Sequence, residues 1–506
     1  MSTQTDVERD VVVVGGGPCG STVSTLVAMQ GHRVLLLEKE KFPRYQIGES
    51  LLPATIHGIC KILGVSEDLE RAGFTVKRGG TFRWGSNPKP WEFSFALSPK
   101  FADGASTAYQ VERMRFDQIL LDNARRKGVE VVEQASVVDI IEDGDRVCGV
   151  SFVDASGVRH EVRSRYVVDA SGNKSRIHGR VGGQRRYSEF FRNLALFGYF
   201  EGGKRMPPPN QGNILGVAFE SGWFWYIPLT PDLTSVGAVL LPEELDRAQG
   251  DREKALMELI QECPMIADYL ADARRVTEGP YGEIRVRKDY SYIQEKFWRP
   301  GMVVVGDAAC FIDPVFSQGV HLATYGALLA ARSLNTALSN GADETTSFDE
   351  FETRYRMEYA RFHDFLVAFY DMHQDESSYF WKAKKVINSA APALESFVEL
   401  VGGGASNEIA LVDADTYAKR RAAAFQELSS IVERRARGEI ENHELLKASL
   451  IRSVAKEGHR IQIQAAVGEN VDGQVPVRLG GLVPSADGLH WTVPAKQLVA
   501  ERMSRP

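Results

Sequence analysis

Residues 9–40 read RDVVVVGGGPCGSTVSTLVAMQGHRVLLLEKE, and this stretch decides the fold of the N-terminal region. The run Val11–Val14 is continuously apolar and β-branched, which is typical of a strand buried on both faces of a parallel sheet. A helical stretch follows, Gly31 ends it, and a second apolar strand is expected at Val34–Leu37. The order of strand, helix and strand predicts a Rossmann-type α/β unit.

The turn between these elements carries a dinucleotide-binding pattern, Gly15-x-Gly17-Pro18-x-Gly20. Its glycines permit a tight turn and let backbone amides approach a pyrophosphate at the start of a helix. Glu38 ends the second strand, where a carboxylate accepts hydrogen bonds from a ribose 2′-hydroxyl and repels the extra phosphate of NADP. The motif predicts a bound dinucleotide and leaves FAD and NAD both open.

Two later segments repeat a pattern in which a buried strand ends at an aspartate. Residues 166–176 read YVVDASGNKSR, and residues 302–321 read MVVVGDAACFIDPVFSQGVH. Asp169 and Asp307 therefore stand at strand ends, where a carboxylate binds sugar or ribityl hydroxyls. The sequence contains no second Gly-x-Gly-x-x-Gly, so we infer one bound dinucleotide.

Composition restricts the remaining classes of function. The chain has 506 residues, which predicts two or three domains, and its net charge of −7 argues against a general nucleic-acid binder. Its five cysteines show no spacing typical of a zinc site or a disulfide framework, so no metal is expected. The polar N-terminus lacks a secretory signal, and no apolar run is long enough to cross a membrane. We expect a cytoplasmic protein without membrane or nucleic-acid partners.

The octapeptide GWFWYIPL at 222–229 is unusually rich in aromatic residues. Alternation places Trp223, Trp225 and Ile227 on one face of a strand, with Phe224 and Tyr226 on the other. Further along, aromatic residues recur every three or four positions through 345–372, which predicts a helix with one aromatic face. Both patterns fit core packing, and part of the helix face is also a candidate pocket lining.

The order of Gly-x-Gly-x-x-Gly, Asp-Ala-Ser-Gly and Gly-Asp-Ala-Ala resembles FAD monooxygenases of the p-hydroxybenzoate hydroxylase (GR2) type. In that family an arginine that begins a helix faces the flavin, and Arg113 occupies the matching position; a surface charge is the alternative. The resemblance implies a mixed α/β (α+β) fold, with an FAD-binding Rossmann domain, an antiparallel substrate sheet and a helical C-terminal region. The expected domains are an FAD-binding domain of residues 1–80, 105–185 and 285–340, a sheet domain of 81–104 and 186–284, and a mainly helical region 341–506 whose tail, from 460, is a possible β unit.

Four segments resemble flavin-dependent halogenases, specifically the branch that acts on phenolic and related electron-rich rings. They are Gly48–Pro53 (GESLLP), residues 73–85 with Lys77, Trp223-x-Trp225-x-Ile227-Pro228, and Phe311-x-x-Pro314-x-x-Ser317-x-Gly319. The resemblance covers residues 8–385 and implies that reduced FAD and O₂ oxidise chloride or bromide to a hypohalous acid. Lys77 matches the catalytic lysine that holds this oxidant. Lysine suits that task because it has three donors and a pKa that burial lowers; an exposed lysine beside Arg78 is the alternative.

The same resemblance implies further site residues. The turn of Ser317, Gln318 and Gly319, before a helix expected at Val320–Leu334, is the candidate halide site; a turn that only caps the helix and contacts the flavin is the alternative. Trp223, Trp225 and Phe311 are the candidate wall between flavin and substrate. The expected flavin-binding residues are Gly15, Gly17, Pro18, Gly20, Glu38, Arg44, Ile47, Glu49, Ser50, Arg113, Asp169, Asp307, Pro314, Gly319 and Val320.

One position departs from the tryptophan-specific pattern. Tryptophan halogenases carry a glutamate immediately before the serine of this turn, and here that residue is Phe316. A phenol is already activated, especially once ionised from its pKa of about 10, so it needs less help from a carboxylate. This favours a phenolic or pyrrolic ring over free tryptophan.

The sequence therefore predicts a halogenase of natural-product biosynthesis, supplied with reduced FAD by a separate NAD(P)H-dependent flavin reductase. Its expected substrate is a phenolic ring, either a free small molecule or a tyrosyl group on a peptidyl carrier protein. An FAD-dependent aromatic hydroxylase or related reductase is the alternative enzyme, and a flavin-carrying scaffold protein is the non-catalytic alternative. The oligomeric state stays open.

Overall fold

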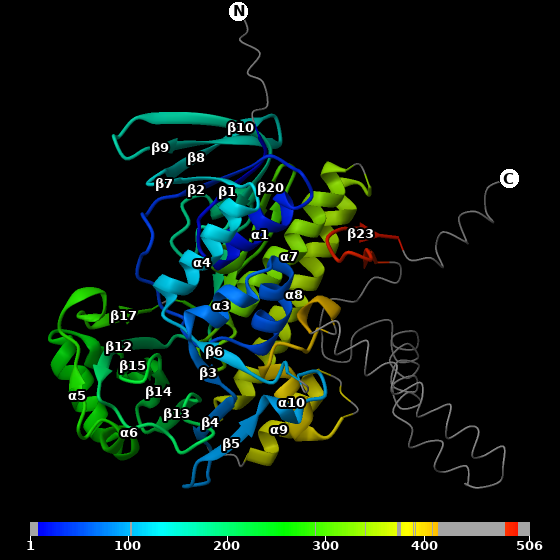
Figure 1. Cartoon of the computed structure of the whole chain (residues 1–506). Coiled ribbons are helices and arrows are strands. Elements are labelled where there is room, and N and C mark those ends of the chain that lie inside the picture. The colour runs from blue at the N-terminus through cyan, green and yellow to red at the C-terminus, as the bar shows by residue number, and fades with distance from the viewer. Residues whose placement is uncertain are drawn as a thin grey trace, which may run out of the picture.

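A computed structural model describes residues 9–101, 104–288, 290–339, 341–371, 376–387, 389, 391–406, 408–412 and 481–493. Residues 413–456 of the expected helical region and most of the tail after residue 460 lie outside these residues. Two large sheets dominate the described part. Figure 1 shows the first sheet, with β1, β2 and β10, above the second, with β12–β15.

The first sheet is the predicted Rossmann unit. Its strands in spatial order are β19 (Trp298–Arg299), β20 (Met302–Val304), β10 (Arg159–Asp169), β1 (Arg9–Val14), β2 (Val34–Glu38) and β7 (Glu130–Glu133). All neighbours pair in parallel except β19 with β20. A hairpin of β8 (Ser136–Asp143) and β9 (Arg146–Val153) continues from the extended start of β10. Val11–Val13 are fully buried, as their continuous apolar run predicts.

Three helices pack beside this sheet and bring its loops together. They are α1 (Pro18–Ala28), α4 (Arg113–Arg126) and α7 (Gln318–Leu338). The last helix is longer at both ends than the expected Val320–Leu334, because Gln318 already has helical geometry and Ser317 is the residue before the first turn. The N-terminus of α7 therefore lies closer to the Pro314 turn than the sequence pattern indicates.

The second sheet is antiparallel apart from one parallel pair, β4 with β13. Its strands in spatial order are β16 (Arg274–Arg275), β12 (Leu194–Glu201), β15 (Leu233–Leu240), β14 (Gly222–Pro228), β13 (Ile214–Phe219), β4 (Gly79–Arg83) and β5 (Trp91–Ser94), with β17 (Arg285–Arg287) beside β12. Helices α5 (Arg252–Glu262) and α6 (Pro264–Tyr269) cover one face. The division of the chain into domains stays a prediction.

Strand β14 is GWFWYIP, and its alternation is confirmed. Trp223, Trp225 and Ile227 pack into the main core, whereas Phe224 and Tyr226 pack into a second cluster with helices α5 and α6. Both faces of the strand are therefore buried. The strand separates the interior that contains the flavin motifs from a purely structural layer.

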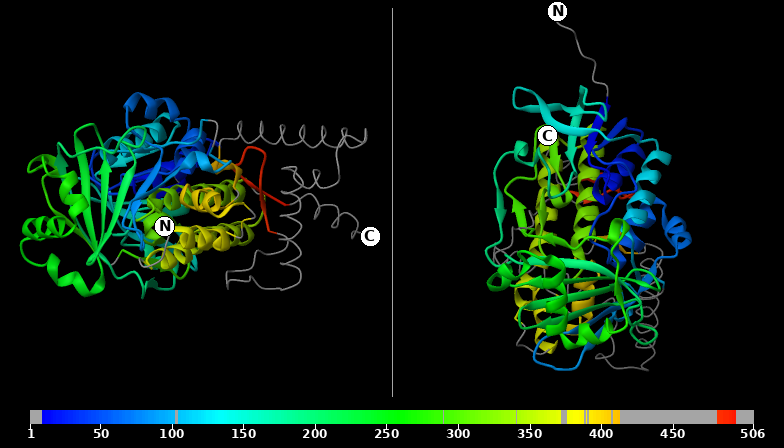
Figure 2. Two further views of the ribbon diagram at one scale, coloured as in Figure 1. Left: turned by 90° about the horizontal axis from the view of Figure 1, so that it is seen from below. Right: turned by 90° about the vertical axis from the view of Figure 1, so that its left-hand side faces the viewer.

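The predicted aromatic helix is α8 (Glu344–Phe369). Its aromatic residues are buried in the main core: Phe348, Phe351, Tyr355, Tyr359, Phe362, Phe365 and Phe369. Figure 2 shows α7 and α8 running side by side from the first sheet to the second. Helices α9 (Glu376–Val386) and α10 (Ala393–Val401) pack near the far end of α8, and a short hairpin of β22 (Val483–Pro484) and β23 (Trp491–Thr492) contacts α7.

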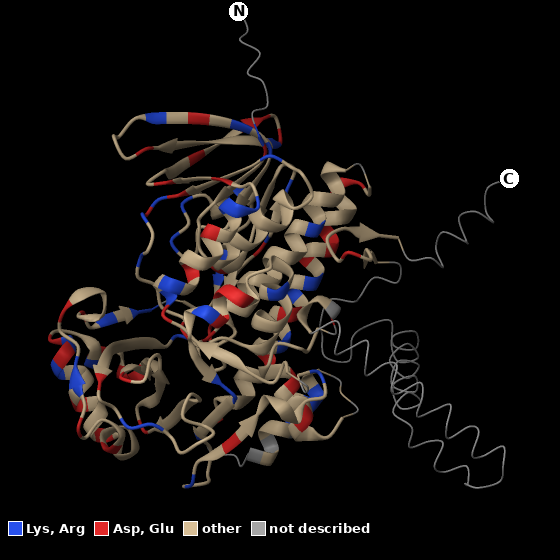
Figure 3. Cartoon of the chain, viewed as in Figure 1, with Lys and Arg blue, Asp and Glu red and all other residues tan. Residues whose placement is uncertain are grey.

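Smaller pairings complete the framework around the site. They are β3 (Thr75–Lys77) with β6 (Ala108–Gln110), and β18 (Tyr292–Gln294) with β11 (Arg185–Tyr187) and β21 (Cys310–Phe311). Figure 3 shows acidic and basic residues interspersed over the described part of the chain. Within that part, every helix is too short or too polar to span a bilayer.

Candidate active site

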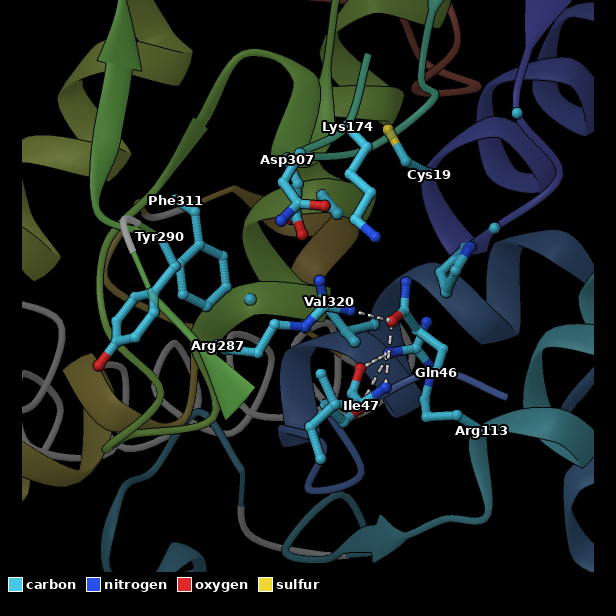
Figure 4. Close-up of a pocket in the computed structure, with 18 of the residues that line it drawn as sticks. Cys19, Gln46, Ile47, Arg113, Lys174, Arg287, Tyr290, Asp307, Phe311 and Val320 are labelled. Carbon is cyan, nitrogen blue, oxygen red and sulfur yellow. Dashed lines mark hydrogen bonds between the residues drawn. The ribbon is translucent and has the colours of Figure 1, made fainter. Parts of the chain in front are cut away.

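A cavity of about 320 Å³ opens between the two sheets, at the carboxyl ends of β1 and β2. Predicted flavin-binding residues on its walls are Gly15, Gly17, Pro18, Glu38, Arg44, Ile47, Arg113, Asp307, Pro314, Gly319 and Val320. Figure 4 shows Arg113 beside Ile47 on one side, Phe311 and Tyr290 on the opposite side, and Asp307 near Lys174. Segments far apart in sequence thus meet at one site.

The glycine loop has the geometry that a dinucleotide needs. A Cβ at Gly20 would lie 1.8 Å from the Gly15 carbonyl oxygen, so α1 approaches the loop as closely as a backbone permits. Glu38 is 5% exposed, and its Oε2 accepts a 2.6 Å hydrogen bond from the Gly16 amide. This carboxylate lies at the edge of the cavity, in position to meet a ribose. These residues fit FAD.

Arg113 begins α4, as predicted, and is 6% exposed, so the surface-charge alternative is wrong. Its guanidinium pairs with Asp117, at 2.7 Å and 2.9 Å, and donates a 2.6 Å hydrogen bond to the Ile47 carbonyl. Arg44 donates to the same Asp117 at 2.6 Å. Asp117 therefore joins both arginines and fixes the 44–48 segment along the cavity.

Asp307 lines the cavity, whereas Asp169 lies behind it. Desolvation raises the pKa of Asp307 to about 6, against the opposing influence of Arg113, Arg287 and Arg185. Asp169 is fully buried and accepts hydrogen bonds from the Ser171 amide and the Ser171 and Ser175 hydroxyls. It shapes the turn whose Ser171 does line the cavity.

Glu49 and Ser50 also lie outside the cavity lining, in the layer below it. Glu49 is 2% exposed and accepts a 2.7 Å hydrogen bond from the Tyr199 hydroxyl, and burial raises its pKa to about 7. Ser50 accepts a 2.8 Å hydrogen bond from Lys77. The GESLLP segment thus connects the flavin cavity to the lysine.

Lys77 ends β3 and is only 3% exposed, so the alternative of an exposed lysine is wrong. Its Nζ donates to Ser50 Oγ at 2.8 Å, to the Leu51 carbonyl at 3.1 Å and to Ser317 Oγ at 3.5 Å. Burial lowers the pKa of Lys77 to about 7. Among the described residues, no carboxylate forms an ion pair with it.

The candidate halide turn lies between Lys77 and the cavity. Ser317 precedes α7 with φ of +62°, Gln318 is fully buried, and Gly319 lines the cavity. A Cβ at Gly319 would lie 2.7 Å from the ring of Phe311, which explains why this position is glycine. Backbone amides at the start of a long helix provide donors and positive potential.

The three predicted wall residues separate into two groups. Trp225 and Phe311 line the cavity, and the Trp225 indole donates to Ser235 Oγ at 3.2 Å. Trp223 is also buried, but it does not line the cavity. Its Nε1 donates to the Tyr370 hydroxyl at 2.8 Å. The sequence pattern did not indicate this partner, nor Tyr290 and Arg287 on the cavity wall.

Comparison with known proteins identifies the family. The model of the tryptophan halogenase family matches residues 10–105 and 97–432. A tryptophan 2-halogenase of Chondromyces crocatus is 33% identical over 404 residues, which cover 78% of this chain and 75% of that protein. The flavin-dependent halogenase armH3 of Armillaria mellea is 29% identical over 438 residues, which cover 82% of this chain and 84% of that protein.

Solved structures agree with this assignment. The myxobacterial chondrochloren halogenase CndH is 49% identical, with 96% of this chain and 99% of that one covered and a TM-score of 0.73. The flavin-dependent halogenase CmlS is 35% identical, with 74% and 67% covered and a TM-score of 0.66. Such enzymes use reduced FAD, O₂ and a halide ion. The chain therefore belongs to the tryptophan halogenase family of FAD-dependent halogenating oxidoreductases.

Proposed function

We propose that this halogenase acts on a phenolic ring, held either as a free small molecule or as a tyrosyl group on a peptidyl carrier protein. The observation that carries the proposal is the environment of Lys77. Its hydrogen-bond partners are two hydroxyls and a carbonyl, and burial alone lowers its pKa. Because no carboxylate is among these partners, a ring halogenated here must already be electron-rich. An ionised phenol meets this requirement.

Phe316 supports the same conclusion. Its ring packs against Phe82, Phe365 and Phe369, at centroid distances of 5.8, 5.3 and 4.5 Å, and is 4% exposed. The position that holds a glutamate in tryptophan halogenases is thus part of an aromatic core, immediately before Ser317.

The residues of the site have separate roles in flavin binding, halide binding and direction of the oxidant. When bound, reduced FAD would give two electrons to O₂ and the halide two more, so that reduced FAD, O₂, a halide ion and a proton become FAD, hypohalous acid and water. Gly15, Gly17, Pro18 and Glu38 would hold the nucleotide part of FAD, and Gly20 lets α1 approach the Gly15 carbonyl. The amides of Gln318 and Gly319 would hold the halide. Lys77 donates hydrogen bonds to the hypohalous acid and directs it toward the ring. A separate NAD(P)H-dependent reductase supplies the reduced flavin.

The substrate class is tested with a panel of aromatic compounds. The protein receives reduced FAD from a reductase, O₂, and chloride or bromide, with free phenols, carrier-tethered tyrosyl groups and tryptophan in parallel. We expect halogen isotope patterns in the mass spectra of phenolic products. Since a relative is a tryptophan 2-halogenase, halogenation of tryptophan with every phenol untouched would contradict the proposal.

Trp225→Phe should weaken the wall between flavin and substrate. The indole of Trp225 packs over Gly237, where an added Cβ would meet it at 2.3 Å, and a smaller ring leaves space beside the cavity. We expect ring halogenation to fall about tenfold, as reacting groups lose their positions, and an oxygenated product to appear.

The control is Trp84→Phe, which removes an equally buried indole that does not line the cavity. Product mass spectra distinguish the two variants. Unchanged halogenation without oxygenated product in Trp225→Phe would show that Trp225 serves only as core packing.

A further inference from the structure

A chain of buried hydrogen bonds runs from Trp223 to the candidate halide turn. The indole Nε1 of Trp223 and the amide of Asn193 both donate to the Tyr370 hydroxyl, at 2.8 and 3.2 Å. Tyr370 follows the last residue of α8, and its hydroxyl lies 2.7 Å from Asp313 Oδ2. An indole N–H only donates, so the one proton of the Tyr370 hydroxyl goes to Asp313.

Asp313 accepts hydrogen bonds from residues 314–319, which include the halide turn, with both its side chain and its backbone carbonyl. Its Oδ1 accepts a 3.0 Å hydrogen bond from the Val315 amide, and its carbonyl accepts one from the Gln318 side chain. The Ser317 amide closes the turn onto the Pro314 carbonyl at 3.0 Å. Ser317 adopts a left-handed conformation that a serine keeps only where its surroundings impose it.

The carboxyl group of Asp313 is fully buried and, among the described residues, has no ion-pair partner. The polar groups that face it are the hydroxyl of Tyr370, the amide of Asn193 and the phenol of Tyr290. Tyr290 lines the flavin cavity, and its hydroxyl is buried without a hydrogen-bond partner. Burial raises the pKa of Asp313 to about 7, and the hydrogen bond from Tyr370 opposes this rise.

We propose that Trp223 and Tyr370 are positioning residues that act through Asp313 on residues 314–319, and that a halide binds this turn only while Asp313 is neutral. The inference rests on the proposed halide site at Ser317, Gln318 and Gly319. A carboxylate in this dry interior repels an anion bound to the same turn, whereas a neutral carboxyl keeps the turn closed without opposing the halide. Trp223 thus serves the site through hydrogen bonds, although it does not line the cavity.

The expected pH dependence has a defined sign. Asp313 gains a negative charge as the pH rises through about 7, so halide binding weakens in that direction. Lys77 loses its positive charge over the same range, which weakens binding in the same direction. The two groups are separated in a Lys77→Met background, where Asp313 alone of the pair titrates.

The test compares Lys77→Met with Lys77→Met/Asp313→Asn. Bromide binding to the FAD-loaded proteins is measured across neutral pH by bromide NMR line broadening. The apparent Kd of Lys77→Met should rise about tenfold per pH unit above the pKa of Asp313. That of the double variant should rise much less, because, within the described part of the chain, only the buried carboxyls of Glu49 and Asp307 still ionise near neutral pH. In the apoprotein, protonated-carboxyl infrared absorption should decrease over the same range. Asp313→Asn should lose the part of this change that Asp313 contributes and keep the part from Glu49 and Asp307.

Tyr370→Phe in the Lys77→Met background tests the positioning residues, because it keeps the ring and removes the hydroxyl. Without that hydrogen bond the carboxylate is less stabilised, so the loss of bromide binding should move to higher pH, and affinity at low pH should fall by up to about tenfold. Trp223→Phe should shift the profile in the same direction by less. The control is Trp91→Phe, which removes a buried indole donor to the Trp84 carbonyl in the same aromatic cluster and should shift nothing. The indole of Trp91 packs against Phe82, Phe369, Phe380 and Phe397.

Three results would overturn the inference. They are no bromide binding by Lys77→Met at low pH, the same pH profile with and without Asp313→Asn, and a Tyr370→Phe profile identical to that of Trp91→Phe. The proposed function fails separately. A wild-type protein that shows the expected binding profiles but halogenates no phenol contradicts the proposed substrate and leaves the inference standing.

Discussion

Lys77→Ala should reduce the rate of ring halogenation by a factor of about 100 or more. The protein should still bind FAD and still oxidise halide. The reason is geometric, since Lys77 lies behind Ser50 and Ser317 and does not line the flavin cavity. Its loss removes the donor that directs the oxidant and leaves the flavin contacts in place. The measurement pairs halogenated product, by mass spectrometry, with free hypohalous acid, by a chemical trap.

Lys77→Met is the matched variant, because methionine fills most of the space of the buried lysine without its charge. Both variants should release hypohalous acid and halogenate no substrate ring. Ring halogenation by Lys77→Met at the wild-type rate would show that the amine has no part in the reaction. Loss of FAD from both variants would assign Lys77 a structural role.

Gly20→Ala should weaken FAD binding about 100-fold. The added Cβ would lie 1.8 Å from the Gly15 carbonyl oxygen, so α1 and the glycine loop must separate and the loop amides lose their common direction. FAD affinity is measured by fluorescence titration, and circular dichroism checks that the variant is folded.

The control for this change is Gly179→Ala. At Gly179 an added Cβ would have no heavy atom within 4 Å, and the residue does not line the flavin cavity. Its FAD affinity should change by a few-fold at most. An equal loss of FAD affinity in the two variants would show that the close contact of Gly20 with the Gly15 carbonyl does not determine FAD binding.

The parts of the fold that could be predicted depend on local patterns. The buried run Val11–Val14 and the glycine loop define the Rossmann unit without reference to the rest of the chain. The alternation in 222–229 correctly assigned each face of β14, because side chains of a strand alternate whatever they pack against. The aromatic period through 345–372 likewise predicted the buried face of α8.

The parts that could not be predicted depend on contacts between distant residues. Trp223 and Tyr370 are 147 positions apart, and no local pattern indicates that the indole turns away from the cavity toward α8. The burial of Lys77 likewise depends on Ser317, which lies 240 positions further along the chain. Sequence identified Trp223, Lys77 and Ser317 as candidates but not Tyr370. The packing of two sheets and two long helices determines which of these residues meet.

The most direct test of the account is the fate of a phenol in the complete reaction. The protein, FAD, NAD(P)H, a flavin reductase and O₂ are combined with a phenolic substrate, once with bromide and once without any halide. We predict a product with the bromine isotope doublet that forms only with bromide and only with the reductase present. A product that gains oxygen, lacks halogen and forms equally well without halide would contradict the account.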